Sequence, residues 1–193
     1  RIADFHYAPT LKAKNHLLDE GITPDQIWVT GNTVIDALFL GLEKLKSYQS
    51  DKIKELKSII AEDRKLILVT GHRRESFGDG FNRICAALKQ LAVRPDVQII
   101  YPVHLNPNVI GPVTDFLGEV DNIRLIEPLG YPEFLWLMEK SYLILTDSGG
   151  IQEEAPSLGK PVLVMRETTE REEAIEAGTA QLVGTNVQKI VRE

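Results

Sequence analysis

The feature that most constrains the fold of this chain is a regular alternation of short apolar runs with longer amphipathic stretches. After residue 60 the apolar runs lie at Leu66–Val69, Val97–Ile100, Ile123–Ile126, Leu143–Leu145, Pro161–Val164 and Gln181–Val183. Helical candidates alternate with them at 81–92, 107–117, 132–140, 149–158 and 170–177. Short apolar runs joined by helices favour strands that are buried on both faces, as in a parallel sheet. Because crossovers between parallel strands are right-handed, the pattern predicts a doubly wound α/β domain with helices on both sides.

The first 60 residues follow a less regular pattern. A helix is expected between Thr10 and Gly21, since glycine is a good C-terminal stop. A short strand is expected at 27–30, followed by helices through 34–45 and 53–60. We therefore expect residues 1–60 to form a helical lead-in and inter-domain segment, and residues 61–193 to form the α/β domain.

Composition narrows the class of protein. The 193 residues are 43% hydrophobic and 26% charged, which fits a globular core. The net charge of −6 argues against general binding to nucleic acid or to anionic membranes. Cys85 is the single cysteine, which excludes an internal disulfide and a multi-cysteine metal site. No apolar run approaches the roughly 18 residues of a membrane-spanning helix, so we expect a soluble, cytoplasmic protein. The chain begins with Arg1 and ends at Glu193 without a stop signal, which leads us to expect a fragment.

Unusual chemistry follows the predicted strands. In doubly wound sheets, ligands bind outside the carboxyl ends of the strands. The segments at those positions are rich in glycine, histidine, arginine and carboxylates: 31–32, 71–75, 102–104, 127–128, 147–150 and 166–167. We therefore expect the ligand at this edge of the sheet.

The segment from Asp147 to Glu154 predicts a phosphate site. Ser148, Gly149 and Gly150 stand between a strand and a helix, where free N–H groups carry a partial positive charge. The alternative is a serine-capped helix whose glycines serve only a tight turn. Glu154 could accept hydrogen bonds from vicinal ribose hydroxyls, or it could be a solvated acid near a helix N-terminus.

Two further segments carry cationic side chains. His72 and Arg73 follow the strand at 66–69 and indicate an anion site, although a basic surface loop is the alternative. Arg166 and Arg171 border another loop, where they could close over the same phosphates or pair with nearby glutamates.

Other sites are rejected on spacing. Gly78–Arg83 nearly matches the dinucleotide fingerprint, but Arg83 takes the place of the third glycine. There is no Walker phosphate loop and no serine-hydrolase elbow, and the four histidines lack metal-ligand spacing. We therefore expect a phosphate-bearing ligand, with no metal and no cofactor.

Three segments together resemble a known family, the non-hydrolysing UDP-N-acetylglucosamine 2-epimerases. They are Thr70–Ser76 (TGHRRES), Tyr101–Pro107 (YPVHLNP) and the run from Leu145–Gly150 (LTDSGG) to Met165–Arg171 (MRETTER). The resemblance covers essentially the whole chain but only the C-terminal half of the family's protein. It implies a Rossmann-like domain of a two-domain glycosyltransferase-B architecture, in which this domain holds most of the UDP.

The resemblance also implies roles for individual residues. His72 would contact the UDP-sugar near its phosphates as a catalytic residue. Ser148, Gly149 and Gly150 would donate to the diphosphate, while the other predicted contacts are ribose, closing-loop and uracil residues: Glu154, Arg171 and Phe134.

Arg73 and His104 match a regulatory site at which a second UDP-sugar activates bacterial members. The chain departs from the family at Glu172, where proline is usual, and at Leu129, where some members have glutamine near the base. Glu172 puts the preorganisation of the closing loop in doubt.

The implied reaction eliminates UDP to give 2-acetamidoglucal and then re-adds it with the proton on the other face. The resemblance places the carboxylates that move the proton in the family's N-terminal half, so none is predicted in this chain. Family members are usually homodimers, and we expect this chain alone to bind UDP weakly without epimerising. The alternatives are a UDP-sugar glycosyltransferase or hydrolysing epimerase of the same fold, and a non-catalytic nucleotide-sugar sensor.

Overall fold

The computed structural model describes residues 2–71, 73 and 78–193. The chain divides into two compact units, residues 1–43 and residues 44–193.

The first unit is built around a pair of short parallel strands. It contains β1 (His6–Ala8), α1 (Leu11–Asp19), a 3₁₀ turn (Pro24–Gln26), β2 (Ile27–Val29) and most of α2 (Thr33–Leu45). The Thr10 side chain caps α1 by accepting from the amide of Ala13 at 3.1 Å. The sequence predicted α1, β2 and α2 but missed β1, because only three residues pair and they form no apolar run.

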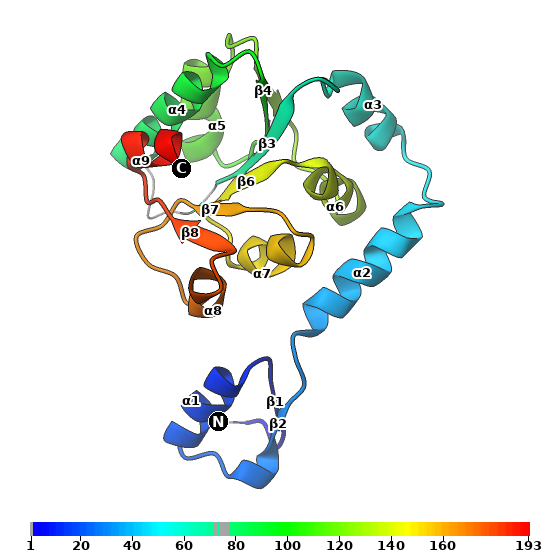
Figure 1. Ribbon diagram of the computed structural model, residues 1–193, viewed down its shortest axis with the longest axis vertical. Helices are drawn as coiled ribbons and strands as arrows, with labels where there is room; N and C mark the ends of the chain where they lie inside the picture. The colour runs from blue at the N-terminus through cyan, green and yellow to red at the C-terminus, as the bar shows by residue number, and fades with distance from the viewer. Residues whose placement is uncertain (1, 72, 74–77) are drawn as a thin grey trace. The chain divides into compact units, whose positions relative to one another are not determined.

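The second unit is a six-stranded parallel sheet with helices on both faces (Figure 1). Its elements are α3 (Asp51–Ile59), β3 (Lys65–Thr70), α4 (Asp79–Ala92), β4 (Val97–Pro102), α5 (Pro107–Leu117), β5 (Ile123–Ile126), α6 (Tyr131–Lys140), β6 (Leu143–Thr146), α7 (Gly149–Ser157), β7 (Val162–Val164), α8 (Glu172–Glu176), β8 (Ala180–Leu182) and α9 (Val187–Arg192). The strand order is β5-β4-β3-β6-β7-β8, which is that of a doubly wound Rossmann-like sheet. The predicted fold class is confirmed. The order reverses between β3 and β6, and ligands bind at such a point in sheets of this kind.

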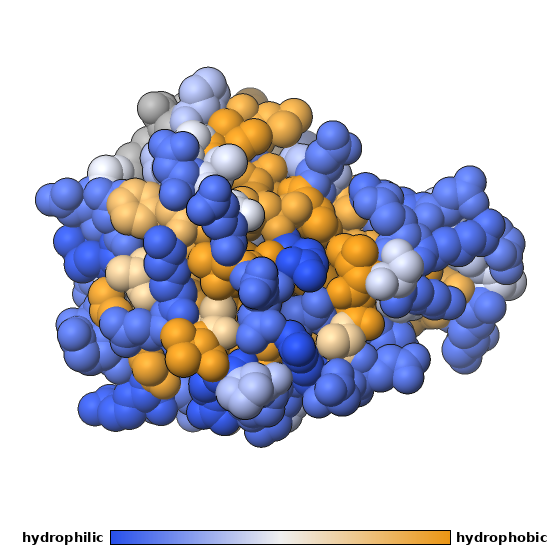
Figure 2. Space-filling model, turned by 90° about the horizontal axis from the view of Figure 1, so that it is seen from above, coloured by the Kyte–Doolittle hydropathy of each residue, from blue (hydrophilic) through white to orange (hydrophobic). Residues whose placement is uncertain are grey.

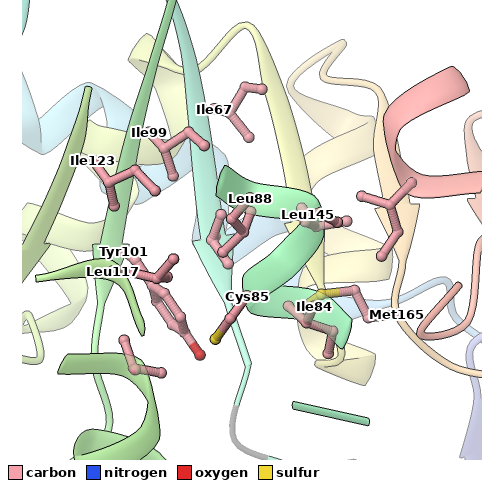
Figure 3. Close-up of a cluster of buried hydrophobic side chains, with 14 of the residues drawn as sticks. Ile67, Ile84, Cys85, Leu88, Ile99, Tyr101, Leu117, Ile123, Leu145 and Met165 are labelled. Carbon is pink, nitrogen blue, oxygen red and sulfur yellow. The ribbon is translucent and has the colours of Figure 1, made fainter. Parts of the chain in front are cut away.

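The main hydrophobic core lies between the sheet and the helix α4. Figure 3 shows side chains of neighbouring strands, such as Ile67, Ile99 and Leu145, facing Leu88 of α4. Cys85 of α4 is 1% exposed and lies beside Tyr101 of β4. Burial raises the pKa of the Cys85 thiol to about 11. This cysteine is therefore part of the packed core.

The helix α3 packs in the same unit as the sheet. The buried side chain of Gln98 on β4 accepts from the amide of Ala61 at 2.8 Å and donates to the carbonyl of Ile59 at 2.7 Å. At the other end, Ser50 and Tyr48 donate to Glu133 of α6 at 2.8 and 3.2 Å. The compact unit accordingly begins at Lys44. The functional boundary that the sequence placed between residues 60 and 61 stays a prediction.

Figure 2 shows a mixed surface, on which hydrophobic residues form separate groups among hydrophilic ones. Within the described part of the chain, no helix has the length and apolar character needed to cross a membrane.

Candidate functional site

The reversal point of the sheet is held together by two threonines. Thr70 and Thr146 are register partners at the ends of β3 and β6, and their hydroxyl oxygens lie 2.6 Å apart. The Thr146 hydroxyl also accepts from the amide of Ser148 at 3.0 Å. These bonds fix where the chain leaves β6, and therefore where α7 begins.

The N-terminus of α7 starts at this position, and its first two residues are glycines. Gly149 and Gly150 open the helix, and Ser148 occupies the cap position. Within the described residues the Ser148 side chain makes no capping hydrogen bond. The sequence left open a serine cap as the alternative to a phosphate site, and that cap is not formed here. The helix end thus presents backbone N–H groups with a partial positive charge.

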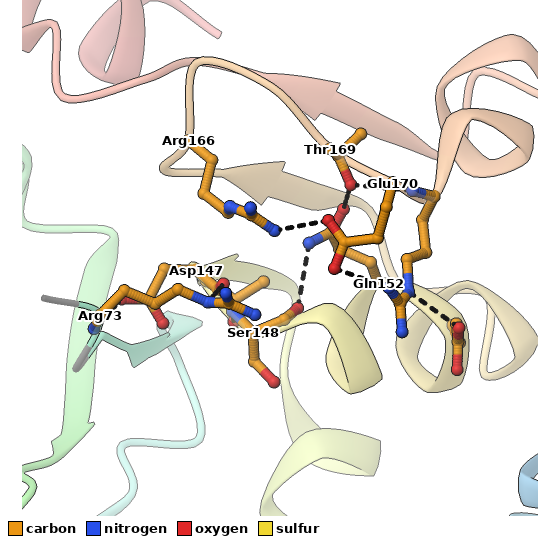
Figure 4. Close-up of polar contacts among 10 residues, drawn as sticks. Arg73, Asp147, Ser148, Gln152, Arg166, Thr169 and Glu170 are labelled. Carbon is orange, nitrogen blue, oxygen red and sulfur yellow. Dashed lines mark hydrogen bonds and ion pairs between the residues drawn. The ribbon is translucent and has the colours of Figure 1, made fainter. Parts of the chain in front are cut away.

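Arg171 lies over this helix end. A Cβ atom on Gly149 would stand only 3.2 Å from Arg171 Cζ, so a larger residue at this position would push the guanidinium back by a few tenths of an ångström. Arg171 also pairs with Glu153 at 2.9 Å and with Glu170 at 2.6 Å. Arg166 pairs with Glu170 at 2.8 Å (Figure 4). Both arginines therefore pair with glutamates, while Arg171 stays next to the predicted phosphate site.

A buried glutamine fixes the loop that carries Arg171. Gln152, 1% exposed, donates to the carbonyl of Ser148 at 3.1 Å and accepts from the Thr169 hydroxyl at 2.6 Å (Figure 4). The same Thr169 hydroxyl accepts from the amide of Arg171 at 3.1 Å. Our sequence reasoning missed Gln152. The available signal was its spacing, since a residue four positions after Ser148 lies above it on the helix.

Asp147 joins the loop after β3 to the same edge. This buried residue accepts from the amide of Arg73 at its Oδ2 atom (2.8 Å), and its carbonyl accepts from Arg73 Nε (3.0 Å). The Tyr101 hydroxyl donates to the carbonyl of Gly71 at 2.8 Å. Sequence reasoning had not singled out Asp147. Arg73 is thereby brought beside the strand end that precedes Ser148.

Of the two histidines predicted as site residues, the structure describes one. His104 is exposed after β4, the strand next to β3, and its Nδ1 atom accepts from the amide of Asn106 at 3.1 Å. It therefore lies at the same edge of the sheet as Arg73. His72, the predicted catalytic residue, lies outside the described residues.

Glu154 faces α6. It is 8% exposed, and burial raises the pKa of its carboxyl above the ordinary value. Its Oε2 atom accepts from the Tyr131 hydroxyl at 3.0 Å. Burial, together with this carboxylate, raises the pKa of Tyr131 to about 12. Tyr131 was not predicted as a site residue, although it lies one helical turn before Phe134, which is partly buried in α6.

The described residues thus bring together Ser148, Gly149, Gly150, Glu154 and Arg171 around one helix end. Among these described residues, no group of three or more His, Cys, Asp or Glu side chains is arranged to hold a metal ion. The chemistry on offer is the binding of an anion at the helix end, with a carboxylate acceptor one turn further along α7.

Comparison with known proteins points in one direction. A family model described as UDP-N-acetylglucosamine 2-epimerase matches residues 1–193. A Campylobacter jejuni protein named UDP-N-acetylglucosamine 2-epimerase is 59% identical over 198 residues, which cover 100% of this chain and 52% of that protein. The chain spans about half the length of the curated relatives it matches.

Solved structures give the same result. The crystal structure of a UDP-GlcNAc 2-epimerase from Neisseria meningitidis, bound to UDP-GlcNAc, is 51% identical with a TM-score of 0.90; the match covers 98% of this chain and 52% of that one. An S. aureus protein solved with UDP is 45% identical with a TM-score of 0.88, covering 99% of this chain and 51% of that one.

Proposed function

This chain belongs to the UDP-N-acetylglucosamine 2-epimerase family, and on that basis we propose that it is the UDP-binding half of a non-hydrolysing epimerase. The whole enzyme would interconvert UDP-GlcNAc and UDP-ManNAc. The observation that carries the proposal is the end of α7, where two glycines open the helix next to the Arg171 guanidinium at the reversal point of the sheet.

The diphosphate of UDP would bind at this helix end. Backbone N–H groups of Gly149 and Gly150 and the Ser148 hydroxyl would donate to its oxygens, and Arg171 would supply a fixed positive charge. His72 joins them on motif position alone. Glu170 forms ion pairs with both Arg171 and Arg166 in the structure, and phosphate oxygens would take over part of that pairing.

The uridine would extend from the helix end towards α6. Glu154 would accept from the ribose hydroxyls, and the Phe134 ring would stack beside the uracil. Support for this arrangement comes from the contact between the two helices, since the Tyr131 hydroxyl reaches Glu154 from the same turn that carries Phe134.

In this reaction, the role of this half of the protein would be to stabilise UDP as the leaving group. A base removes the proton at C2, the C1–O bond breaks, and UDP leaves with the bonding electrons, giving 2-acetamidoglucal. Re-addition of UDP with a proton on the opposite face completes the epimerisation. The donors at the end of α7 and Arg171 would balance the charge that develops on the diphosphate. Loss of one such donor typically costs about 3 kcal/mol, or on the order of a hundredfold in rate.

The remaining assignments are proposals that rest on the family. Arg73 and His104 would contact a second UDP-sugar that acts as an activator, which agrees with their positions in the loops after the adjacent strands β3 and β4. Residues 61–193 would form the UDP-binding domain. The whole protein would be a cytoplasmic homodimer, and the carboxylates that move the C2 proton would come from its other half.

The first experiment is calorimetric titration of UDP into the 193-residue chain and its Glu154→Ala variant. We expect the chain to bind UDP and the variant to bind about tenfold more weakly, since a hydrogen bond to a charged group is lost. The matched control is Glu119→Ala, which changes an exposed glutamate in the loop between α5 and β5. It should leave the affinity for UDP unchanged. No detectable binding of UDP would contradict the proposal.

A turnover assay distinguishes the 193-residue chain from the full-length protein. Incubated with UDP-GlcNAc in heavy water, the chain alone should give no UDP-ManNAc and no deuterium at C2, because the proton-transfer groups belong to the other half. The full-length protein should give both. Epimerisation by the chain alone would contradict the division of labour. Free sugar, or a requirement for an acceptor, would instead indicate a hydrolysing epimerase or a glycosyltransferase.

A further inference from the structure

We propose that Tyr131 is a positioning residue for the nucleotide: its hydroxyl holds one oxygen of Glu154 so that the other oxygen is presented to the ribose. This inference rests on the proposed function. It assigns a role to a side chain outside the predicted site, and it explains how a carboxylate in the middle of α7 is kept available for a ligand.

The contact is specific in its geometry. The Tyr131 hydroxyl donates to Glu154 Oε2 at 3.0 Å. The other oxygen, Oε1, lies 3.6 Å from the point that a Cβ atom on Gly150 would occupy. One oxygen therefore faces α6, and the other lies over the glycine turn that opens α7. This second oxygen is on the side where the diphosphate would bind.

The contact also offsets an energetic cost. A buried carboxylate needs hydrogen-bond donors, and Glu154 lies beyond the first turn of α7, which carries no acidic residue. It therefore does not take up the N–H groups at the helix end that the diphosphate would use. Because Tyr131 supplies a donor from the neighbouring helix, Glu154 is held by one oxygen without using those of its own helix.

The surrounding charges define the protonation of this carboxylate. Burial raises the pKa of Glu154, the hydrogen bond from Tyr131 lowers it, and the nearby Glu153 raises it. Glu153 is itself paired with Arg171. Tyr131 is thus the group that favours the ionised carboxylate, whose second oxygen is left to accept from a ribose hydroxyl.

The test compares ligands that do and do not carry a ribose. In the 193-residue chain, Tyr131→Phe should weaken the binding of UDP about tenfold. Without the Tyr131 hydroxyl, Glu154 is no longer held in place, and its hydrogen bond from the ribose is lost. Affinity for inorganic pyrophosphate should stay within about twofold, as expected for independent sites. With 2′,3′-dideoxy-UDP the wild-type chain and the variant should bind alike. Tyr142→Phe, at an exposed tyrosine before β6, is the matched control and should bind every ligand normally.

A double-mutant cycle and a pH series complete the design. In a Glu154→Ala background, Tyr131→Phe should have no further effect on UDP affinity. Between about pH 4 and pH 7, the ribose-dependent part of the affinity should appear at higher pH in Tyr131→Phe than in the wild type, because loss of the donor raises the pKa of Glu154.

The outcomes are distinguishable. Equal losses for UDP and pyrophosphate, or a loss that persists in the Glu154→Ala background, would show that Tyr131 only supports the local structure and would overturn the inference. A wild-type chain that binds pyrophosphate but not UDP would overturn the proposed function itself. Wild-type binding of UDP with no change in Tyr131→Phe would overturn the inference alone.

Discussion

At the level of single residues, Glu154 has two roles that oppose each other energetically. As a ligand it is useful only when ionised, yet its burial makes ionisation costly. Desolvation raises its pKa in the folded chain above the unfolded value. The stability that this group contributes is therefore present in full at low pH, and it is lost as the pH rises through the folded pKa.

This gives a prediction about pH and stability. Glu154→Gln keeps the volume and the acceptor for Tyr131 but carries no charge, so its thermal midpoint should exceed that of the wild type at pH 7.5. The difference should vanish below about pH 4, where the wild-type carboxyl is protonated as well. Thermal denaturation followed by circular dichroism across this range measures it. A variant that is less stable than the wild type at pH 7.5 would show that burying the ionised carboxylate does not cost stability.

Single residues also mark the limit of prediction from sequence. The predicted residues Ser148, Gly149, Gly150, Glu154 and Arg171 do assemble around one helix end, because consecutive residues at a strand end cannot avoid sharing an edge. The supporting residues depend on side chains that meet only in the folded chain. Asp147 with Arg73 and Gln152 with Thr169 are contacts of this kind.

At the level of elements, periodicity predicted the sheet well. Every apolar run after residue 60 became a strand of one parallel sheet, since buried strands need continuous apolar sequence. The elements that were missed are short and lie near the ends: β1, and α9 with its cap at Asn186. Such elements are formed by packing rather than by their own pattern.

The polar residue inside β4 is an exception to the apolar pattern, and it has a function in the fold. Gln98→Leu should lower the free energy of unfolding by about 2 kcal/mol, because the amide of Ala61 and the carbonyl of Ile59 lose their partner. Urea denaturation is the measurement. Gln188→Leu in α9, the same change at an exposed position, should have little effect. Equal values for the two variants would mean that the link between α3 and β4 contributes nothing.

At the level of the whole molecule, the division into units separates the proposed binding residues from the first part of the chain. The predicted UDP contacts in the described residues run from Phe134 to Arg171, all within the unit that begins at Lys44. The links of Tyr48 and Ser50 to Glu133 also lie within that unit. Binding of UDP should therefore be a property of this unit.

A chain shortened to residues 44–193 should bind UDP with the affinity of the 193-residue chain, within about twofold. Calorimetry on both, with Glu154→Ala introduced into each, provides the comparison. A shortened chain that folds by circular dichroism but has lost UDP binding would show that residues 1–43 contribute to the site.

The buried thiol of Cys85 can serve as a probe of how often the core opens. A reagent that alkylates thiols cannot reach this side chain while α4 covers the sheet, and the protonated sulfur would react slowly even if it could. Labelling must wait for an opening of the structure, and its rate reports how often that happens. A nucleotide bound at the N-terminal end of α7 would slow this labelling as its occupancy rises, without touching the cysteine.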